Sequence, residues 1–273
     1  LFRLTDNKNT SSINSFSFRY KVLRTIFLLK LFLISNTTLP KLKIMLTTIL
    51  VSLMLFCSSF NEGFTPINLS NNKYDSLSNI ELQKEYQKQL KIIKSKKKNI
   101  QYIDSLGIYL HTTLTSEVFP AWYGTEWDYN GYTNKPREGI VACGYFVSTT
   151  LKHVGFNLNR FDLAKMYSSS IVKSLCAKSL TFDDIDNMFA HILENDDHLY
   201  LVGLSSHVGF IEKKDGAIYF IHSNYIGPVA VEKELAKNSD ALNSSDVFVL
   251  GNITGNPELM KKWRNNIKIN IVD

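Results

Sequence analysis

Residues 206–223 read Ser206-His207-Val208-Gly209-Phe210-Ile211-Glu212-Lys213-Lys214-Asp215-Gly216-Ala217-Ile218-Tyr219-Phe220-Ile221-His222-Ser223, which is two apolar runs separated by a polar turn. Both runs are rich in β-branched and aromatic residues, and a Lys-Lys-Asp-Gly segment between them is typical of a hairpin loop. The stretch therefore predicts two antiparallel strands, at 206–212 and 217–223.

The sequence on either side of this hairpin predicts the fold class. Helical periodicity dominates before it, and strand patterns dominate around and after it. We expect helices from residue 79, over 102–117, from residue 143 to about 154, over 161–175 and over 182–194, and further strands at 198–204, 228–232 and 246–251. Helices first and strands last predict an α+β fold with an antiparallel sheet.

The first of these helices has a well-defined start. Ser78-Asn79-Ile80-Glu81 is a capping box, and one apolar stripe follows it, made of Leu82, Tyr86, Leu90 and Ile93. Seven lysines between Lys84 and Lys98 occupy the other positions, and we interpret them as a solvated helix face rather than as a contact for an anionic surface.

The basic charge of the chain is concentrated near its beginning. The whole sequence has a formal charge of +6, but residues 1–59 contain eight lysines and arginines and only one acidic residue. The remaining residues carry 23 basic and 24 acidic side chains, so the composition does not favour nucleic acid as a partner.

The segment 45–59 has the features of a signal peptide. Lys41 and Lys43 precede the apolar stretch from Met45 to Phe56, and small residues follow it. Since the chain begins with Leu, Met45 is a candidate start, with residues 1–44 as upstream sequence. We therefore expect a secreted, periplasmic or cell-envelope protein without a stable membrane span after signal removal.

The rest of the chain is expected to have three parts. Residues 60–77 are polar and predict a linker, 78–120 a helical region, and 121–273 the main domain. Three cysteines are too few for a disulfide framework.

Cys143 is the main candidate for chemistry. Phe146, Val147, Leu151 and Val154 recur at helical spacing after it, so it lies on the first turn of a helix. Because a helix N-terminus stabilises an anion, we expect the pKa of this thiol to be lowered.

The hairpin adds His207 and His222 to this candidate site. A four-residue loop at 213–216 would place His207 opposite His222, whereas a two-residue Asp215-Gly216 loop would place it opposite Asn224. Either register puts the three side chains on one face. Lys213 and Lys214 fit an exposed loop better than paired strand positions, which favours the four-residue loop and His222.

These segments resemble the NlpC-type, papain-like cell-wall cysteine peptidases. Ala142-Cys143-Gly144-Tyr145-Phe146-Val147 is similar to the family's Asp-Cys-Ser-Gly-Phe-Val helix, and His207-Val208-Gly209-Phe210 to its His-Val-Gly-Ile strand. Phe220-Ile221-His222-Ser223 resembles the Ile-His-Ala-Ser strand. The loop Gly124-Thr125-Glu126-Trp127 through Asn130-Gly131 is similar to Gly-Thr-Pro-Tyr…Gly-Gly.

The resemblance covers about residues 122–225 and implies a papain-like fold. It implies Cys143 as nucleophile, His207 as base and His222 as its orienting partner, with peptidoglycan stem peptides as substrate and no cofactor. Ala142 replaces the family's Asp, Gly144-Tyr145 its Ser-Gly, and Trp127 the tyrosine of the loop. Asn224 is the alternative orienter. Candidate substrate or oxyanion contacts are Tyr123, Trp127 and Tyr129.

Two other classes of function stay open. Cys143, His207 and His222 have the ligand types of a zinc site, although no fourth ligand is evident. The altered motif around Cys143 is also compatible with a cell-envelope binding module without turnover. We interpret four further residues as structural or exposed: His153, Cys176, His191 and His198.

Overall fold

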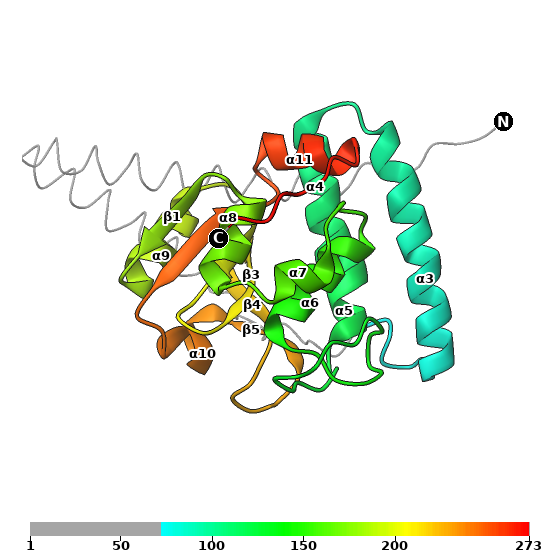
Figure 1. Ribbon diagram of the computed structural model, residues 1–273, viewed down its shortest axis with the longest axis horizontal. Coiled ribbons are helices and arrows are strands. Elements are labelled where there is room, and N and C mark those ends of the chain that lie inside the picture. Colours follow the sequence, from blue (N-terminus) through cyan, green and yellow to red (C-terminus); the bar gives the residue numbers. More distant parts are fainter. Residues whose placement is uncertain (1–71, 273) are drawn as a thin grey trace, which may run out of the picture. The chain divides into compact units, whose positions relative to one another are not determined.

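The structure is a computed structural model that describes residues 72–272 (Figure 1). The predicted signal peptide at 45–59, the sequence upstream of it and residues 60–71 of the predicted linker lie outside the described residues. Within 72–272, none of the helices combines the length and the apolar character that crossing a membrane requires.

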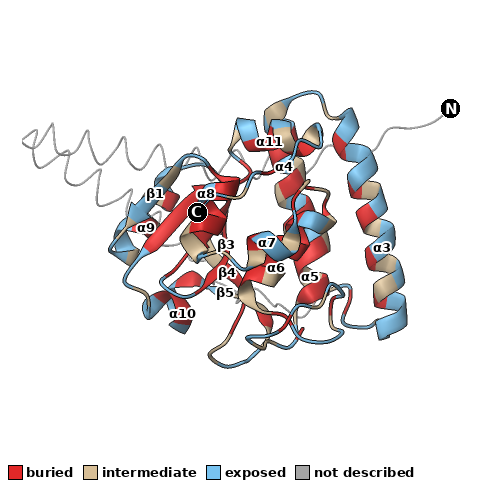
Figure 2. Ribbon diagram, viewed as in Figure 1, coloured by how far each residue is buried: buried red, intermediate tan, exposed pale blue. Residues whose placement is uncertain are grey.

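The helical region opens with α3 (Asn79–Lys96), which begins as the sequence predicts. Ser78 is its N-cap, and both hydrogen bonds of the capping box with Glu81 are present. The predicted stripe is buried (Figure 2). Lys97, however, is only 4% exposed, and its ammonium donates to the carbonyls of Gly155 and Trp263, at 2.7 Å each. The prediction of a fully solvated lysine face is therefore wrong at this position.

The next helices depart from the predicted bounds. A 3-10 turn (Lys97–Asn99) leads to α4 (Ile103–Thr113), a π-helical turn η2 (Leu114–Val118) and α5 (Phe119–Trp122). Pro120 thus lies in the first turn of α5, where a missing N–H costs little. The helix expected over 161–175 is two helices, α7 (Arg160–Ala164) and α8 (Ser168–Leu175).

The α+β prediction is confirmed by one six-stranded antiparallel sheet. Its order is β1-β6-β2-β3-β4-β5, so the central hairpin β3–β4 lies between β2 and β5. The strand bounds are β1 (Ser179–Phe182), β2 (Leu199–Gly203), β3 (Val208–Lys214), β4 (Ala217–Ser223), β5 (Val231–Leu235) and β6 (Phe248–Asn252). The sequence pattern does not predict β1, and β5 extends to Leu235, past its predicted end at residue 232.

Helices cover both faces of the sheet (Figure 1). On one face, α6 (Cys143–His153) and α8 share a core cluster with Phe210, Ile221 and the helical region before residue 120. On the other face, α9 (Ile185–Glu194) and α10 (Asp240–Asn243) pack with Ile211 and Phe220. A short η3 turn (Ala236–Asn238) precedes α10, and α11 (Pro257–Arg264) joins the first cluster.

The two regions predicted on either side of residue 120 share one core. Residues 72–77 also pack on it, because Tyr74 is fully buried and its hydroxyl donates to the Glu117 carbonyl at 2.9 Å. Arg137 pairs with Asp75 at 2.6 Å. Residues 72–77 therefore belong to the folded unit.

Candidate active site

Cys143 is the first residue of α6, as the sequence predicts. Its N-cap is Ala142, whose side chain cannot accept a hydrogen bond, so the N-terminus of α6 has no side-chain cap. Phe146 packs against Phe210 of β3, with ring centroids 6.0 Å apart, which fixes the helix against the sheet. The half-buried thiol is therefore positioned by a rigid contact between a helix and a strand.

The electrostatic expectation for this thiol is wrong. Burial raises the pKa of Cys143, and the backbone N–H groups of Val208, Gly144 and Cys143 itself offset this only in part. The helix N-terminus acts in the expected direction, but loss of hydration has the larger effect. The resting state at neutral pH is a thiol.

The hairpin register differs from the prediction. Lys214 pairs with Ala217 and Glu212 with Tyr219, so the loop has two residues, not four. Asp215 and Gly216 have φ angles of 51° and 79°, as a type I′ turn requires. Lys213 can occupy a paired strand position, opposite Ile218, because its ammonium donates to the Leu193 and Asn195 carbonyls at the C-terminal end of α9. A tertiary contact thus satisfies a lysine that we expected to be exposed.

His222 nevertheless contacts His207. His207 Nε2 lies 2.9 Å from His222 Nδ1, and both rings are buried. In the observed register the two are diagonal neighbours, and such pairs lie within reach of rings and long side chains. Phe220 stacks on the His222 ring, with centroids 4.0 Å apart, and holds it in this direction.

The thiol and the histidine pair lie on opposite faces of the sheet and are linked at the start of β3 through the backbone. The Val208 N–H points at the Cys143 thiol, and Val208 directly follows His207. Cys143 packs against the first core cluster, whereas the His207 and His222 rings lie against Phe220 of the second. Among residues 72–272 we find no hydrogen bond between Sγ and the His207 ring, so the transfer of a proton between them belongs to the proposal below.

The His207 imidazole is held in its neutral form. Burial, together with the neighbouring His222, lowers its pKa well below the ordinary value. Tyr225 packs on the His207 ring with centroids 5.0 Å apart, and Trp127 packs on Tyr225 at 6.1 Å. The structure therefore brings Trp127 to the site through Tyr225, a residue that the sequence analysis did not select.

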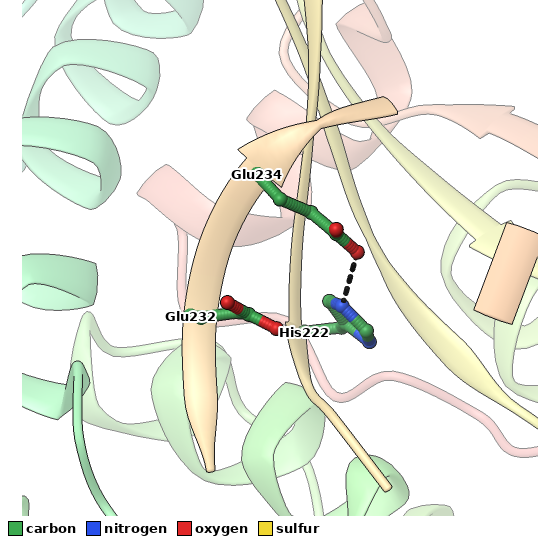
Figure 3. A group of neighbouring side chains, drawn as sticks. All are labelled: His222, Glu232 and Glu234. Atoms are coloured by element: carbon green, nitrogen blue, oxygen red, sulfur yellow. Dashed lines mark hydrogen bonds and ion pairs between the residues drawn. The ribbon is translucent and has the colours of Figure 1, made fainter. Parts of the chain in front are cut away.

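Two glutamates of β5 complete the surroundings of His222 (Figure 3). His222 Nε2 lies 3.0 Å from Glu234 Oε1, and Glu232 is the residue opposite His222 across β4 and β5. Asn224 does not take the orienting place that the two-residue loop seemed to offer it. Its side-chain amide donates to Glu232, and its Oδ1 accepts from the Ile226 N–H at 2.9 Å.

His222, Glu232 and Glu234 are also the one metal-type cluster among the described residues. Each offers a ligand atom within 4.8 Å of the others (Figure 3). The hydrogen bonds above already use His222 Nε2 and both carboxylates. Cys143 and His207, which the zinc hypothesis required, are not in this cluster.

The remaining candidates lie away from this pair. Tyr123 packs against the first core cluster near Glu212, and burial there raises its pKa. Tyr129 is 81% exposed. Cys176 donates to the Asn252 carbonyl at 3.3 Å, and His153 Nδ1 lies 3.0 Å from the Tyr86 hydroxyl, so both have structural partners.

Comparisons with known proteins give no match: no family model, no curated protein and no solved structure is similar to the chain. The site can therefore be argued only from its own geometry. It combines a thiol at an uncapped helix N-terminus with a buried, hydrogen-bonded pair of imidazoles. Chemically, the helix N-terminus can stabilise an anion at the thiol, and the neutral His207 imidazole can accept a proton.

Proposed function

We propose that this protein is a cysteine hydrolase that cleaves amide bonds, with Cys143 as nucleophile and His207 as general base. The observation that carries the proposal is the 2.9 Å contact between His207 Nε2 and His222 Nδ1, because it orients a neutral imidazole at the start of β3. The position of Cys143 at the N-terminus of α6, near Val208, supports the pairing.

Acylation begins from a neutral pair. The pKa of the thiol is raised and that of His207 is lowered, so proton transfer accompanies attack and does not precede it. The S–H proton moves to His207 while the sulfur electron pair forms a bond to the amide carbon. The N–H groups at the start of α6 stabilise the oxyanion.

Collapse of the tetrahedral intermediate formed by this attack breaks the C–N bond. His207 gives its proton to the leaving amine, and a thioester to Cys143 remains. His207 then takes a proton from water, which attacks the thioester carbon and releases the acid. The thiol regains its proton in this step, so the cycle needs no cofactor.

Peptidoglycan stem peptides are the proposed substrate. The resemblance of residues 122–225 to the NlpC-type peptidases supports this choice, as does the leader pattern at 45–59, which would deliver the protein to the envelope or outside the cell. A papain-like arrangement of the helix and sheet is part of the same proposal.

Digestion of purified peptidoglycan, with mass analysis of the soluble fragments, tests this function. Wild type and Cys176→Ala should release fragments that carry a new amino and a new carboxyl group in the stem peptide. Cys143→Ala should release none. Release of the same fragments by Cys143→Ala, or of none by wild type, would overturn the proposal.

A second candidate is a binding module without turnover. The raised pKa of the half-buried Cys143 thiol favours it, since a packed cysteine needs no activation. In that case wild type and Cys143→Ala should both sediment with peptidoglycan and leave it intact.

A further inference from the structure

The His222 ring is held at both of its nitrogens. His207 Nε2 lies 2.9 Å from Nδ1, and Glu234 Oε1 lies 3.0 Å from Nε2. The ring is fully buried, so water does not compete for either nitrogen. A chain of two hydrogen bonds therefore connects the candidate base to a carboxylate on β5. Figure 3 shows the second of them, between His222 and Glu234.

The strand register explains how Glu234 reaches this ring. Phe220 is the residue opposite Glu234, and Glu232 is opposite His222. Glu234 extends diagonally across β4, whereas Glu232 is turned toward the Asn224 amide. Two carboxylates of the same strand thus face one histidine, but only Glu234 hydrogen-bonds to it.

The positions of the protons in the His207–His222–Glu234 hydrogen bonds follow from which groups can donate. Burial pushes the pKa of Glu234 upward, but hydrogen bonds from His222 and Ser239 outweigh this and lower it. An ionised carboxylate can only accept, so His222 Nε2 must carry a proton. A His222 ring whose single N–H is at Nε2 has Nδ1 as an acceptor. His207 must then donate from Nε2, and its lone pair remains on Nδ1.

We propose that Glu234 is a positioning residue that fixes both histidines as Nε2–H tautomers and so makes His207 Nδ1 the basic atom. The use of this atom rests on the proposed function, in which it takes the Cys143 proton. When the S–H bond breaks, the new N–H forms at Nδ1, and the charge of Glu234 stabilises the resulting imidazolium through His222.

Nitrogen-15 NMR of histidine-labelled protein at pH 8 tests this directly. In wild type, both rings should show a protonated Nε2 and an unprotonated Nδ1. In the isosteric Glu234→Gln variant the side-chain amide can either donate or accept, so both rings should lose this preference. Glu232→Gln is the matched control and should keep it. A Nδ1–H tautomer in the wild type, or unchanged tautomers in Glu234→Gln, would overturn the proposal.

Turnover supplies a second readout. Glu234→Gln should lower kcat on the order of 10- to 100-fold with little change in KM, and Glu232→Gln should change kcat less than about threefold. The NMR measurement requires neither substrate nor thiol. If the tautomers are as predicted and wild type does not hydrolyse peptidoglycan, only the proposed function fails. If wild type hydrolyses it and Glu234→Gln is equally active with unchanged tautomers, only the role of Glu234 fails.

Discussion

Gly209 and His222 approach each other so closely that no side chain fits between them. A Cβ atom at position 209 would lie 2.8 Å from the His222 Cβ and 2.6 Å from an edge carbon of the Phe220 ring. The missing side chain leaves the space in which Phe220 and His222 stack. Gly209 is therefore a requirement of the histidine pair.

Gly209→Ala should displace the His222 ring and overpack the strand. We expect a loss of about 1–3 kcal/mol in the free energy of unfolding, measured by urea denaturation, because neither neighbour can move freely in the sheet. Gly227→Ala is the control, since a Cβ there meets nothing within 4 Å. Equal stability of the two variants would contradict this reading of the contact.

His222 and Asn224 should differ strongly in their effect on turnover. His222→Ala removes the partner of His207 Nε2 and frees the imidazole to take other tautomers and rotamers. Its kcat should fall on the order of 10²–10⁴-fold, by analogy with other triads. Asn224→Ala should cost less than about tenfold, because its amide binds Glu232. The reverse ranking would assign the orienting role to Asn224.

Stability should depend on the titration of His153. Burial, with smaller contributions from Lys94 and Arg160, lowers its pKa from 6.5 to about 4. Between these pH values the unfolded chain therefore binds more protons than the folded one. The contribution of neutral His153 to the free energy of unfolding is complete above pH 6.5 and is lost as the pH falls toward 4. It amounts to about 3 kcal/mol.

The variant His153→Gln isolates this effect. Glutamine keeps an acceptor for the Tyr86 hydroxyl and does not titrate. Urea unfolding at a series of pH values should show a shallower decline below pH 6.5 than in wild type. Parallel declines of the two proteins would show that His153 does not contribute.

The fold and half of the site follow from local sequence patterns. A capping box and periodicity place α3, periodicity places α6, and alternation places the central hairpin with both histidines on one face. The register could not be predicted, because the paired strand position of Lys213 depends on tertiary contacts of its ammonium with the Leu193 and Asn195 carbonyls and the Asp197 carboxylate. The split between α7 and α8 was also not predicted. The backbone of Ala164, at the end of α7, lies so close to Gly144 of α6 that no side chain fits at position 144.

The contact of Glu234 with His222 and the raised pKa of the Cys143 thiol also depend on tertiary structure, so the sequence does not predict them. A glutamate near a strand end is an ordinary surface residue until the β4–β5 register brings it to His222. The helix N-terminus at Cys143 is visible in the sequence, but the desolvation that outweighs it is not.

The rate of Cys143 alkylation by iodoacetamide at pH 7, followed by peptide mass analysis, tests most directly whether His207 activates this thiol. Buried Cys176, whose pKa burial raises to about 12, is the internal control and should stay unmodified. We predict that Cys143 reacts at least about tenfold faster in wild type than in His207→Gln, because the imidazole takes the thiol proton as the sulfur attacks. Equal rates in the two proteins would contradict the account.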